Sequence, residues 1–319
     1  MKRILYFTLI LFIIIQLIPL ENIKSQNLNE VKLAIGYIPH VQFTPLYVGI
    51  EKNIYKKYGI DLKIDYGFGI DIFSLLSSEK IDIGLSDSDQ LIVAGAKGID
   101  LKAIFQYYQK YPVTIVAKKG KIDKIDDFVG KKLGTPDFFG TTFIGMLIFL
   151  NYFDLTNKVK IEKIGYTQVS SLVSDKIDAA VCFYNNEPIQ LEANGVKLNY
   201  WNVKDFSEIV GASFITSGNI LKRKKSIIDN FILATKESID YTVSYINEAF
   251  LISKKYVKGI ENDEIMKKVL IKTAELFYNK KGYGYIDKDK YEESIKILYN
   301  LGIIDKIYNV LNIIYLYNK

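Results

Sequence analysis

The chain has 319 residues, of which 49% are hydrophobic and 24% are charged, and its formal net charge at pH 7 is +6. This composition excludes a disordered or collagen-like chain, and the mild positive charge is too small for the basic surface that a nucleic-acid partner requires. A single cysteine, Cys182, and a single histidine, His40, exclude a disulfide framework and a Cys/His zinc site. We therefore expect no nucleic-acid partner, no metal and no cofactor.

Arginine is scarce. The sequence holds only Arg3 and Arg223, and Arg3 lies in a segment that we expect to be removed. Because proteins usually grip sulfonate, phosphate or carboxylate groups with a bidentate arginine, a small strong anion is a disfavoured ligand.

The first 25 residues have the pattern of a secretory signal peptide. Lys2 and Arg3 precede an apolar run over residues 5–20, and Ser25 offers a small residue for cleavage. The run is shorter than the ~20 residues that span a bilayer, so a retained membrane anchor is the weaker interpretation. No cysteine lies near the cleavage region, which excludes a lipoprotein anchor. We predict cleavage of residues 1–25 and a periplasmic location.

Short apolar strands alternate with helical segments over the first part of the mature chain. The predicted strands cover residues 31–37, 61–66, 81–85, 101–107 and 113–118. The predicted helices cover residues 45–58, 70–78 and 89–97. This alternation is typical of an α/β fold with a parallel sheet.

The alternation restarts after Gly120 and gives way to helices. The second set of predicted strands covers residues 131–135, 160–165, 178–183 and 210–216. The helices between them cover residues 141–152, 168–174 and 187–194. Apolar residues at helical spacing then predict helices over residues 226–245, 248–256, 261–278 and 287–301.

We predict two α/β lobes joined by two crossover strands, with a helical C-terminal part. Lobe 1 comprises residues 26–117 and 213–319, and lobe 2 comprises residues 118–212. The two crossings would form a hinge, and a ligand cleft would lie between the lobes at the carboxyl ends of both sheets.

The candidate ligand-binding residues follow the predicted strands. They are Pro39, Gln42, Phe43, Phe68, Asp87, Tyr107, Gln109, Phe139, Gly140, Thr141, Thr142, Gln168, Tyr184, Asn185, Asn186 and Glu187. The polar members are mostly amides and hydroxyls, which both donate and accept hydrogen bonds, and the aromatic members offer flat faces. Together they suit an uncharged heteroaromatic ring. We predict no catalytic residue.

Several of these residues have an equally plausible structural role. Asp87 and the segment 185–187 can cap helices, and Phe139 can belong to the core. His40 is more often a surface histidine than a catalytic one.

Four short segments carry a family resemblance: Tyr47-Val48, residues 79–84, residues 130–134 and residues 176–180. With them, the chain from about residue 31 to about residue 278 resembles the solute-binding proteins of ABC importers in the thiamine-pyrimidine-synthase-like family. The resemblance implies the type 2 periplasmic-binding-protein fold.

A narrower set of motifs is similar to the riboflavin-importer branch of that family. The motifs are residues 36–39, 41–43, 65–68, 139–141, 144–145, 165–168 and 185–191. The resemblance implies capture of riboflavin outside the inner membrane and delivery to an ABC permease. We expect the protein to be a monomer. The ribityl hydroxyls of riboflavin would suit threonine and asparagine side chains.

Two alternatives remain open. The same amide and aromatic side chains would also bind a thiamine pyrimidine precursor. Eukaryotic relatives are similar to pyrimidine synthases that consume their own histidine and use a pyridoxal cofactor, which makes His40 a residue to consider. Against an enzyme, the cysteine-rich run associated with those synthases is absent.

Overall fold

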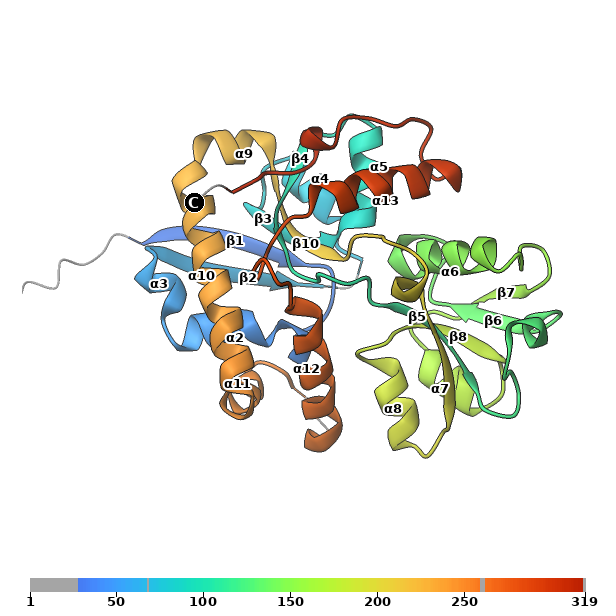
Figure 1. Ribbon diagram of the computed structural model, residues 1–319. Coiled ribbons are helices and arrows are strands. Elements are labelled where there is room, and N and C mark those ends of the chain that lie inside the picture. Colours follow the sequence, from blue (N-terminus) through green and yellow to red (C-terminus); the bar gives the residue numbers. More distant parts are fainter. Residues whose placement is uncertain (1–27, 68, 259–261, 318–319) are drawn as a thin grey trace, which may run out of the picture.

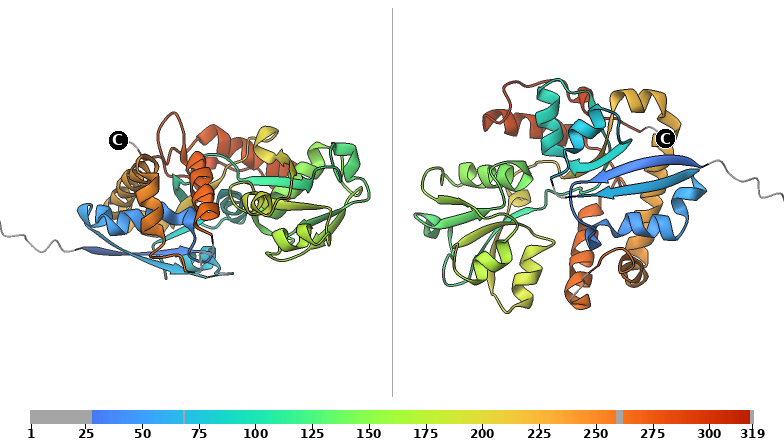
Figure 2. Two further views of the ribbon diagram at one scale, coloured as in Figure 1. Left: turned by 90° about the horizontal axis from the view of Figure 1, so that it is seen from below. Right: turned by 180° about the vertical axis from the view of Figure 1, so that it is seen from behind.

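The computed structural model describes residues 28–67, 69–258 and 262–317 (Figure 1). The predicted signal peptide and Phe68 lie outside these residues. Two five-stranded sheets stand side by side, each covered by helices, as the further views in Figure 2 also show. The predicted α/β class is therefore confirmed.

The first sheet has the strand order β2-β1-β3-β10-β4. Its strands are β1 (Asn29–Ile35), β2 (Ile60–Tyr66), β3 (Ile83–Asp87), β4 (Leu101–Gln106) and β10 (Ala212–Ser217). β1 pairs in parallel with β2 and β3, whereas β10 lies antiparallel to β3 and β4. The sheet is mixed rather than purely parallel, because the strand that returns from the second sheet enters it in the opposite direction.

The second sheet has the strand order β7-β6-β8-β5-β9. Its strands are β5 (Val113–Lys118), β6 (Lys132–Thr135), β7 (Lys160–Lys163), β8 (Ala179–Phe183) and β9 (Leu198–Asn202). β5 runs antiparallel to β8 and β9, so this sheet is mixed as well. The sequence did not predict β9, an edge strand of five residues.

The pairing of β5 places the first crossing between the lobes earlier in the chain than predicted. The predicted boundary after residue 117 would leave β5 in lobe 1, but the strand pairs only within the second sheet. We therefore place the first crossing at residues 107–112, between β4 and β5, and the second at residues 203–211, between β9 and β10.

The helices either connect the strands or follow the last strand, β10. Those of the first sheet are α2 (Thr44–Glu51), α3 (Ile54–Lys57), α4 (Ile72–Ser77), α5 (Ser88–Ala96), α9 (Gly218–Arg223), α10 (Lys225–Ser244), α11 (Ile246–Ser253), α12 (Asp263–Phe277) and α13 (Lys288–Asn300). Those of the second sheet are α6 (Gly140–Tyr152), α7 (Gln168–Val173) and α8 (Glu187–Ala193). Short 3-10 turns cover Val41–Phe43, Ile125–Phe128, Val203–Asp205 and Val310–Asn312. The single helix predicted over residues 45–58 is broken at Asn53, whose φ of 55° is left-handed.

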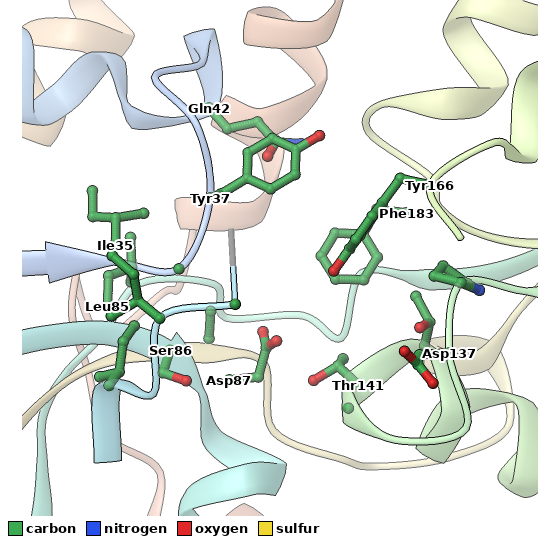
Figure 3. Close-up of a pocket in the computed structure, with 18 of the residues that line it drawn as sticks. Ile35, Tyr37, Gln42, Leu85, Ser86, Asp87, Asp137, Thr141, Tyr166 and Phe183 are labelled. Atoms are coloured by element: carbon green, nitrogen blue, oxygen red, sulfur yellow. The ribbon is translucent and has the colours of Figure 1, made fainter. Parts of the chain in front are cut away.

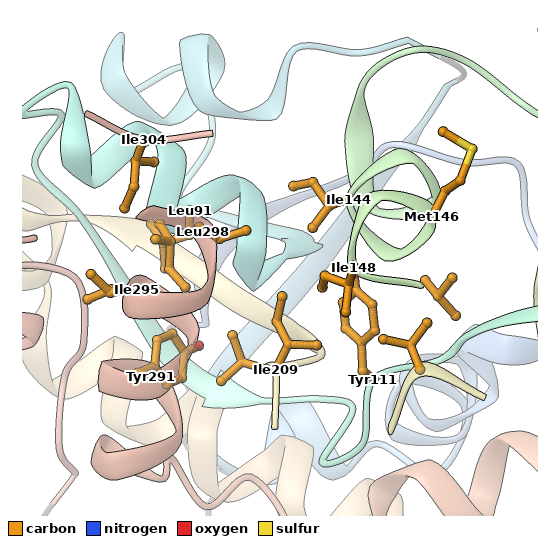
Figure 4. Close-up of a cluster of buried hydrophobic side chains, with 14 of the residues drawn as sticks. Leu91, Tyr111, Ile144, Met146, Ile148, Ile209, Tyr291, Ile295, Leu298 and Ile304 are labelled. Atoms are coloured by element: carbon orange, nitrogen blue, oxygen red, sulfur yellow. The ribbon is translucent and has the colours of Figure 1, made fainter. Parts of the chain in front are cut away.

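One apolar core continues from the first sheet to the second. Leu91 of α5 and Leu298 of α13 belong to the same buried cluster as Ile144 of α6 (Figure 4). Tyr111 and Ile209, one from each crossing, lie in that cluster and are fully buried. Because burying apolar area is favourable at roughly 25 cal/mol per Å², this shared core stabilises the side-by-side arrangement of the sheets.

The two crossings lie close together and are linked by hydrogen bonds. The amide Nε2 of Gln106 donates to the carbonyl oxygens of Tyr108, Gly211 and Ala212 at 3.1, 2.9 and 3.0 Å. A Cβ built on Gly211 would lie 2.4 Å from the carbonyl oxygen of Tyr108. A glycine is therefore required at residue 211 for the two crossings to approach this closely.

The C-terminal segment covers the edge of the first sheet. The backbone N–H of Ala103 in β4 donates to Ile313, and the N–H of Tyr315 donates to Ala103, both at 2.8 Å. The Tyr308 hydroxyl donates to the carbonyl of Ile92 at 2.7 Å. An edge strand with unpaired backbone groups invites aggregation, and this segment protects β4 from it. None of the helices formed by the described residues is long and apolar enough to traverse a bilayer.

Candidate ligand-binding site

A cavity of about 520 Å³ lies between the two sheets. Ile35, Leu85 and Asp87 line it from the ends of β1 and β3. Thr141 of α6 and Phe183 of β8 line it from the other side (Figure 3). Cavities of ~300–1,000 Å³ are usual for small-molecule ligands, and α/β folds bind them at the carboxyl ends of strands.

The wall of this cavity, which we call the inner chamber, contains most of the predicted residues. The predicted residues that line it are Gln42, Phe43, Asp87, Tyr107, Phe139, Gly140, Thr141, Thr142, Gln168, Asn186 and Glu187. They come from six separate segments of the chain that the two sheets bring to one place.

Pro39, Gln109, Tyr184 and Asn185 are not among the lining residues. The Nε2 atom of Gln109 donates to the carbonyls of Gln106 and Tyr285 at 2.9 and 3.1 Å, and its Oε1 accepts from Asn279 at 2.9 Å. The side chain of Gln109 therefore holds the turn after β4 against the segment that precedes α13.

Tyr184 and Asn185 also hold the structure together away from the cavity. The Nδ2 atom of Asn185 donates to the hydroxyl of Thr273 in α12 at 2.9 Å, which links the two sheets. The Tyr184 ring is buried in the apolar core of the first sheet, and the Lys204 ammonium lies 5.8 Å from its centroid.

Other wall residues were not predicted: Tyr37, Ser86, Asp137, Tyr166 and Phe183. The rings of Tyr37 and Tyr166 approach each other from opposite sheets, with centroids 6.5 Å apart and planes at 65°. Each ring directly follows a glycine at a strand end, Gly36 and Gly165, and that pattern was a usable signal.

Two carboxyl groups lie at the junction of the sheets. Asp89 is fully buried, and its two oxygens accept from the hydroxyls of Thr141 and Tyr111 at 2.9 and 2.8 Å. Asp87 is half-buried in the chamber wall. Burial and the nearby charge of Asp89 raise the pKa of Asp87 to about 7, against the opposing effect of a hydrogen bond with Thr141.

The remaining charges of the described wall are carboxylates as well. Glu187 accepts from the backbone N–H of Phe183 and from Nδ2 of Asn186, both at 2.9 Å, and burial raises its pKa. Asp137 pairs with Lys163 at 2.8 Å. No lysine or arginine occurs among the described residues of the wall, so an anionic ligand would meet repulsion and no countercharge.

Gln42 offers a donor to a ligand. Its Nε2 atom is buried and lacks a hydrogen-bond partner within the described protein. Its backbone carbonyl accepts from the Tyr107 hydroxyl at 2.7 Å, which fixes the position of the residue. A buried donor left without a partner costs ~1–3 kcal/mol, and a carbonyl or ring nitrogen of a ligand would recover that energy.

His40 lies outside the wall of the inner chamber. It is buried, and its Nδ1 atom accepts from the backbone N–H of Gln42 at 3.4 Å, at the start of the 3-10 turn. Burial lowers the pKa of His40 to about 4, so the ring is neutral at pH 7. Its place in the fold is that of a helix cap. In the described part of the chain, no group of three or more potential metal-ligating side chains occurs.

The sequence profile described as NMT1/THI5 like matches residues 40–249. A riboflavin-binding protein, RibY, from Chloroflexus aurantiacus is 24% identical over 87% of this chain and 82% of its own length. A 4-amino-5-hydroxymethyl-2-methylpyrimidine phosphate synthase from Legionella pneumophila is 23% identical over 70% of this chain and 72% of its own.

Solved structures share the architecture. The ligand-binding component of an ABC-type import system from Staphylococcus aureus superposes with a TM-score of 0.69 at 14% identity, over 90% of this chain and 96% of its own. A Candida albicans protein described as having the generic periplasmic binding protein fold gives 0.67 at 16% identity, over 90% and 96% of the two chains. These likenesses confirm the predicted periplasmic-binding-protein fold.

Proposed function

The chain belongs to the NMT1/THI5-like family, and from that premise we propose that it is the solute-binding protein of an ABC importer that captures riboflavin. The ligand would lie in the inner chamber between the two sheets. The similarity to a riboflavin-binding protein over most of both chains supports this ligand, and the likeness to a component of an ABC-type import system supports the role in transport.

The observation that carries the proposal is the chemistry of the chamber wall. It combines the rings of Tyr37, Phe139 and Tyr166 with the amides of Gln42 and Gln168, and no lysine or arginine stands among its described residues. The isoalloxazine ring of riboflavin is flat and uncharged, and its edge carries both donors and acceptors. Rings can stack on its faces while amides bond its edge.

A thiamine pyrimidine precursor is the competing ligand, since one relative makes such a pyrimidine phosphate and another is a formylaminopyrimidine-binding protein. A single-ring pyrimidine would fill less of a 520 Å³ chamber than the three rings of a flavin do. A synthase mechanism that uses His40 finds less support, because His40 lies behind the chamber wall and serves as a cap.

The proposal includes location and partner. We propose that the protein is exported to the periplasm by cleavage of residues 1–25, acts as a monomer and delivers its ligand to an inner-membrane ABC permease. The periplasmic-binding-protein fold supports this arrangement.

Isothermal titration calorimetry of the purified protein with riboflavin and with an aminopyrimidine tests the ligand. We expect saturable binding of riboflavin at micromolar or lower concentration, and a yellow protein when cells supply the vitamin. Tighter binding of the aminopyrimidine would reassign the ligand, and no heat with either compound would remove both.

A further inference from the structure

A second cavity of about 570 Å³ opens directly beside the inner chamber. We call it the outer groove. Both cavities are lined by Tyr37, Tyr166, Gln168, Asn186 and Glu187. Figure 3 shows Tyr37 and Tyr166 on opposite sides of the space. Tyr37 follows β1 of the first sheet, and Tyr166 follows β7 of the second. The two cavities therefore adjoin, and the Tyr37 and Tyr166 rings lie at the boundary between them.

The outer groove differs from the inner chamber in its chemistry. It runs over α7 and α8, and the side chains that line it alone are Thr167, Val169, Ser170, Val173, Gln190 and Asn194. Four of these six carry a hydroxyl or an amide, whereas aromatic and aliphatic side chains make up much of the inner wall.

The polar groups of the outer groove keep hydrogen-bonding capacity for a ligand. Gln190 donates from Nε2 to Oδ1 of Asn186 at 2.9 Å, and Asn194 donates from Nδ2 to the backbone carbonyl of Gln190 at 2.9 Å. Ser170 donates to the carbonyl of Thr167 at 3.2 Å. The amide groups retain a second N–H and a carbonyl oxygen, and the serine hydroxyl retains its lone pairs. Hydroxyl groups of a ligand, which donate and accept, match this mixed set.

The charge of the outer groove selects against an anion. No lysine or arginine is found among the described residues that line either cavity, and the Glu187 carboxyl stands where the two meet. A phosphate on a ligand chain in this groove would face a carboxyl group and would lose its water without gaining a cationic partner.

We propose that the outer groove binds an uncharged polyhydroxylated chain attached to the ring held in the inner chamber. The ligand is then a two-part molecule, with the Tyr37 and Tyr166 rings contacting it where ring and chain join. This inference rests on the proposed function and narrows it, because it excludes the ring alone and the phosphorylated form as the preferred ligands.

Three flavins separate the two proposals in one calorimetric series. Riboflavin carries the ribityl chain, lumichrome has the ring without the chain, and flavin mononucleotide carries a phosphate at the chain end. We expect riboflavin to bind at least tenfold more tightly than either of the other two. Equal affinity for riboflavin and lumichrome would overturn the role of the groove and leave the proposed function intact. Absence of binding by all three would overturn both.

Substitutions in the outer groove test whether the polyhydroxylated chain binds there. Ser170→Ala combined with Asn194→Ala should weaken riboflavin binding about fivefold for each hydrogen bond lost and leave lumichrome unchanged. Equal weakening of both flavins would contradict the proposal.

A charge substitution provides a gain-of-function test that a folding defect does not mimic. Asn194→Lys places an ammonium at the outer groove, and we expect it to raise the affinity for flavin mononucleotide. Asn151→Lys is the matched control, because Asn151 is an exposed asparagine near the end of α6, as Asn194 is the C-cap of α8, and Asn151 does not line either cavity. An equal effect of the two substitutions, or none, would count against a chain in the groove.

Discussion

The side chain of Gln106 and the backbone of Gly211 join the two crossings between the sheets. Nε2 of Gln106 donates to the Gly211 carbonyl at 2.9 Å and at the same time to the Tyr108 carbonyl of the other crossing at 3.1 Å. Gln106 is buried, so these bonds lie in a medium of low dielectric constant where they are strong. The two crossings therefore form one joined unit and not two independent strands.

Gly211→Ala should destabilise the protein by roughly 1–3 kcal/mol, because the added methyl group would overlap the Tyr108 carbonyl oxygen. Urea unfolding followed by circular dichroism measures the change. Gly36→Ala is the control, since the nearest side-chain atom to its added Cβ lies at 3.5 Å. Equal stability of the two variants would show that the crossings move apart without cost.

Thr141→Val should also destabilise the protein, by ~1–3 kcal/mol, because it removes the hydroxyl that donates to the buried carboxyl of Asp89. The substitution keeps the shape of the side chain, so packing changes little. Thr142→Val on the same helix turn serves as the control. If both variants unfold at the same urea concentration, the bond between Thr141 and Asp89 contributes nothing measurable.

The pKa of Asp87 predicts a pH dependence of stability. In the folded protein this pKa is about 7, whereas an unfolded aspartate titrates near 4. Between these values the folded state holds a proton that the unfolded state has released, so stability falls as the pH rises from 4 to 7. In the Asp87→Asn variant, the free energy of unfolding should fall by roughly 2–4 kcal/mol less over this pH range than in the wild type. Urea unfolding of both proteins at pH 5 and pH 8 measures it, and parallel profiles would refute the shift.

The pKa of His40 predicts a pH dependence of stability with the opposite sign. Its pKa is about 4 in the folded protein and near 6.5 in the unfolded chain, so the unfolded state binds the extra proton in this range. Stability is therefore lost as the pH falls from 6.5 to 4. His40→Asn keeps a good capping side chain and removes the titration, so the variant should lose less stability between pH 7 and pH 5 than the wild type. Thermal unfolding at both pH values decides the question.

Gln42→Leu should separate stability from binding. Removing a buried donor that has no protein partner should leave the empty protein at least as stable as the wild type. The same change should weaken riboflavin binding by about 1 kcal/mol, because the ligand loses the donor. Thermal unfolding without ligand and calorimetry with riboflavin give the two values. A variant that is destabilised and binds normally would show that Gln42 has a structural role only.

The sequence predicted the elements of this fold better than their pairing. Apolar runs and helical spacing located β5, α6 and α12 to within a few residues, because these patterns are local. Strand direction depends on where the chain returns, which no local pattern contains, and so the mixed sheets were not foreseen. The short edge strand β9 was missed because its half-buried residues show no clear apolar run.

The candidate site was predicted in its position and only partly in its members. Asp87 at the end of β3 and Thr141 in the helix after β6 reached the chamber wall as expected. Gln109 and Asn185 carry the same amide group as the wall residues Gln42 and Asn186. They instead bond Tyr285, in the loop before α13, and Thr273 of α12. Those partners cannot be assigned from spacing, because the contacts join residues 176 and 88 positions apart.

The strand order of the first sheet also determines the order in which the two sheets can form during synthesis. β10 separates β3 from β4, yet it is the last strand to be synthesised. Until it arrives, β4 has no neighbour within that sheet, whereas β5 to β9 form the second sheet from one uninterrupted stretch of chain. When the chain is synthesised from its amino end, the second sheet can therefore form first, and the first sheet is completed last.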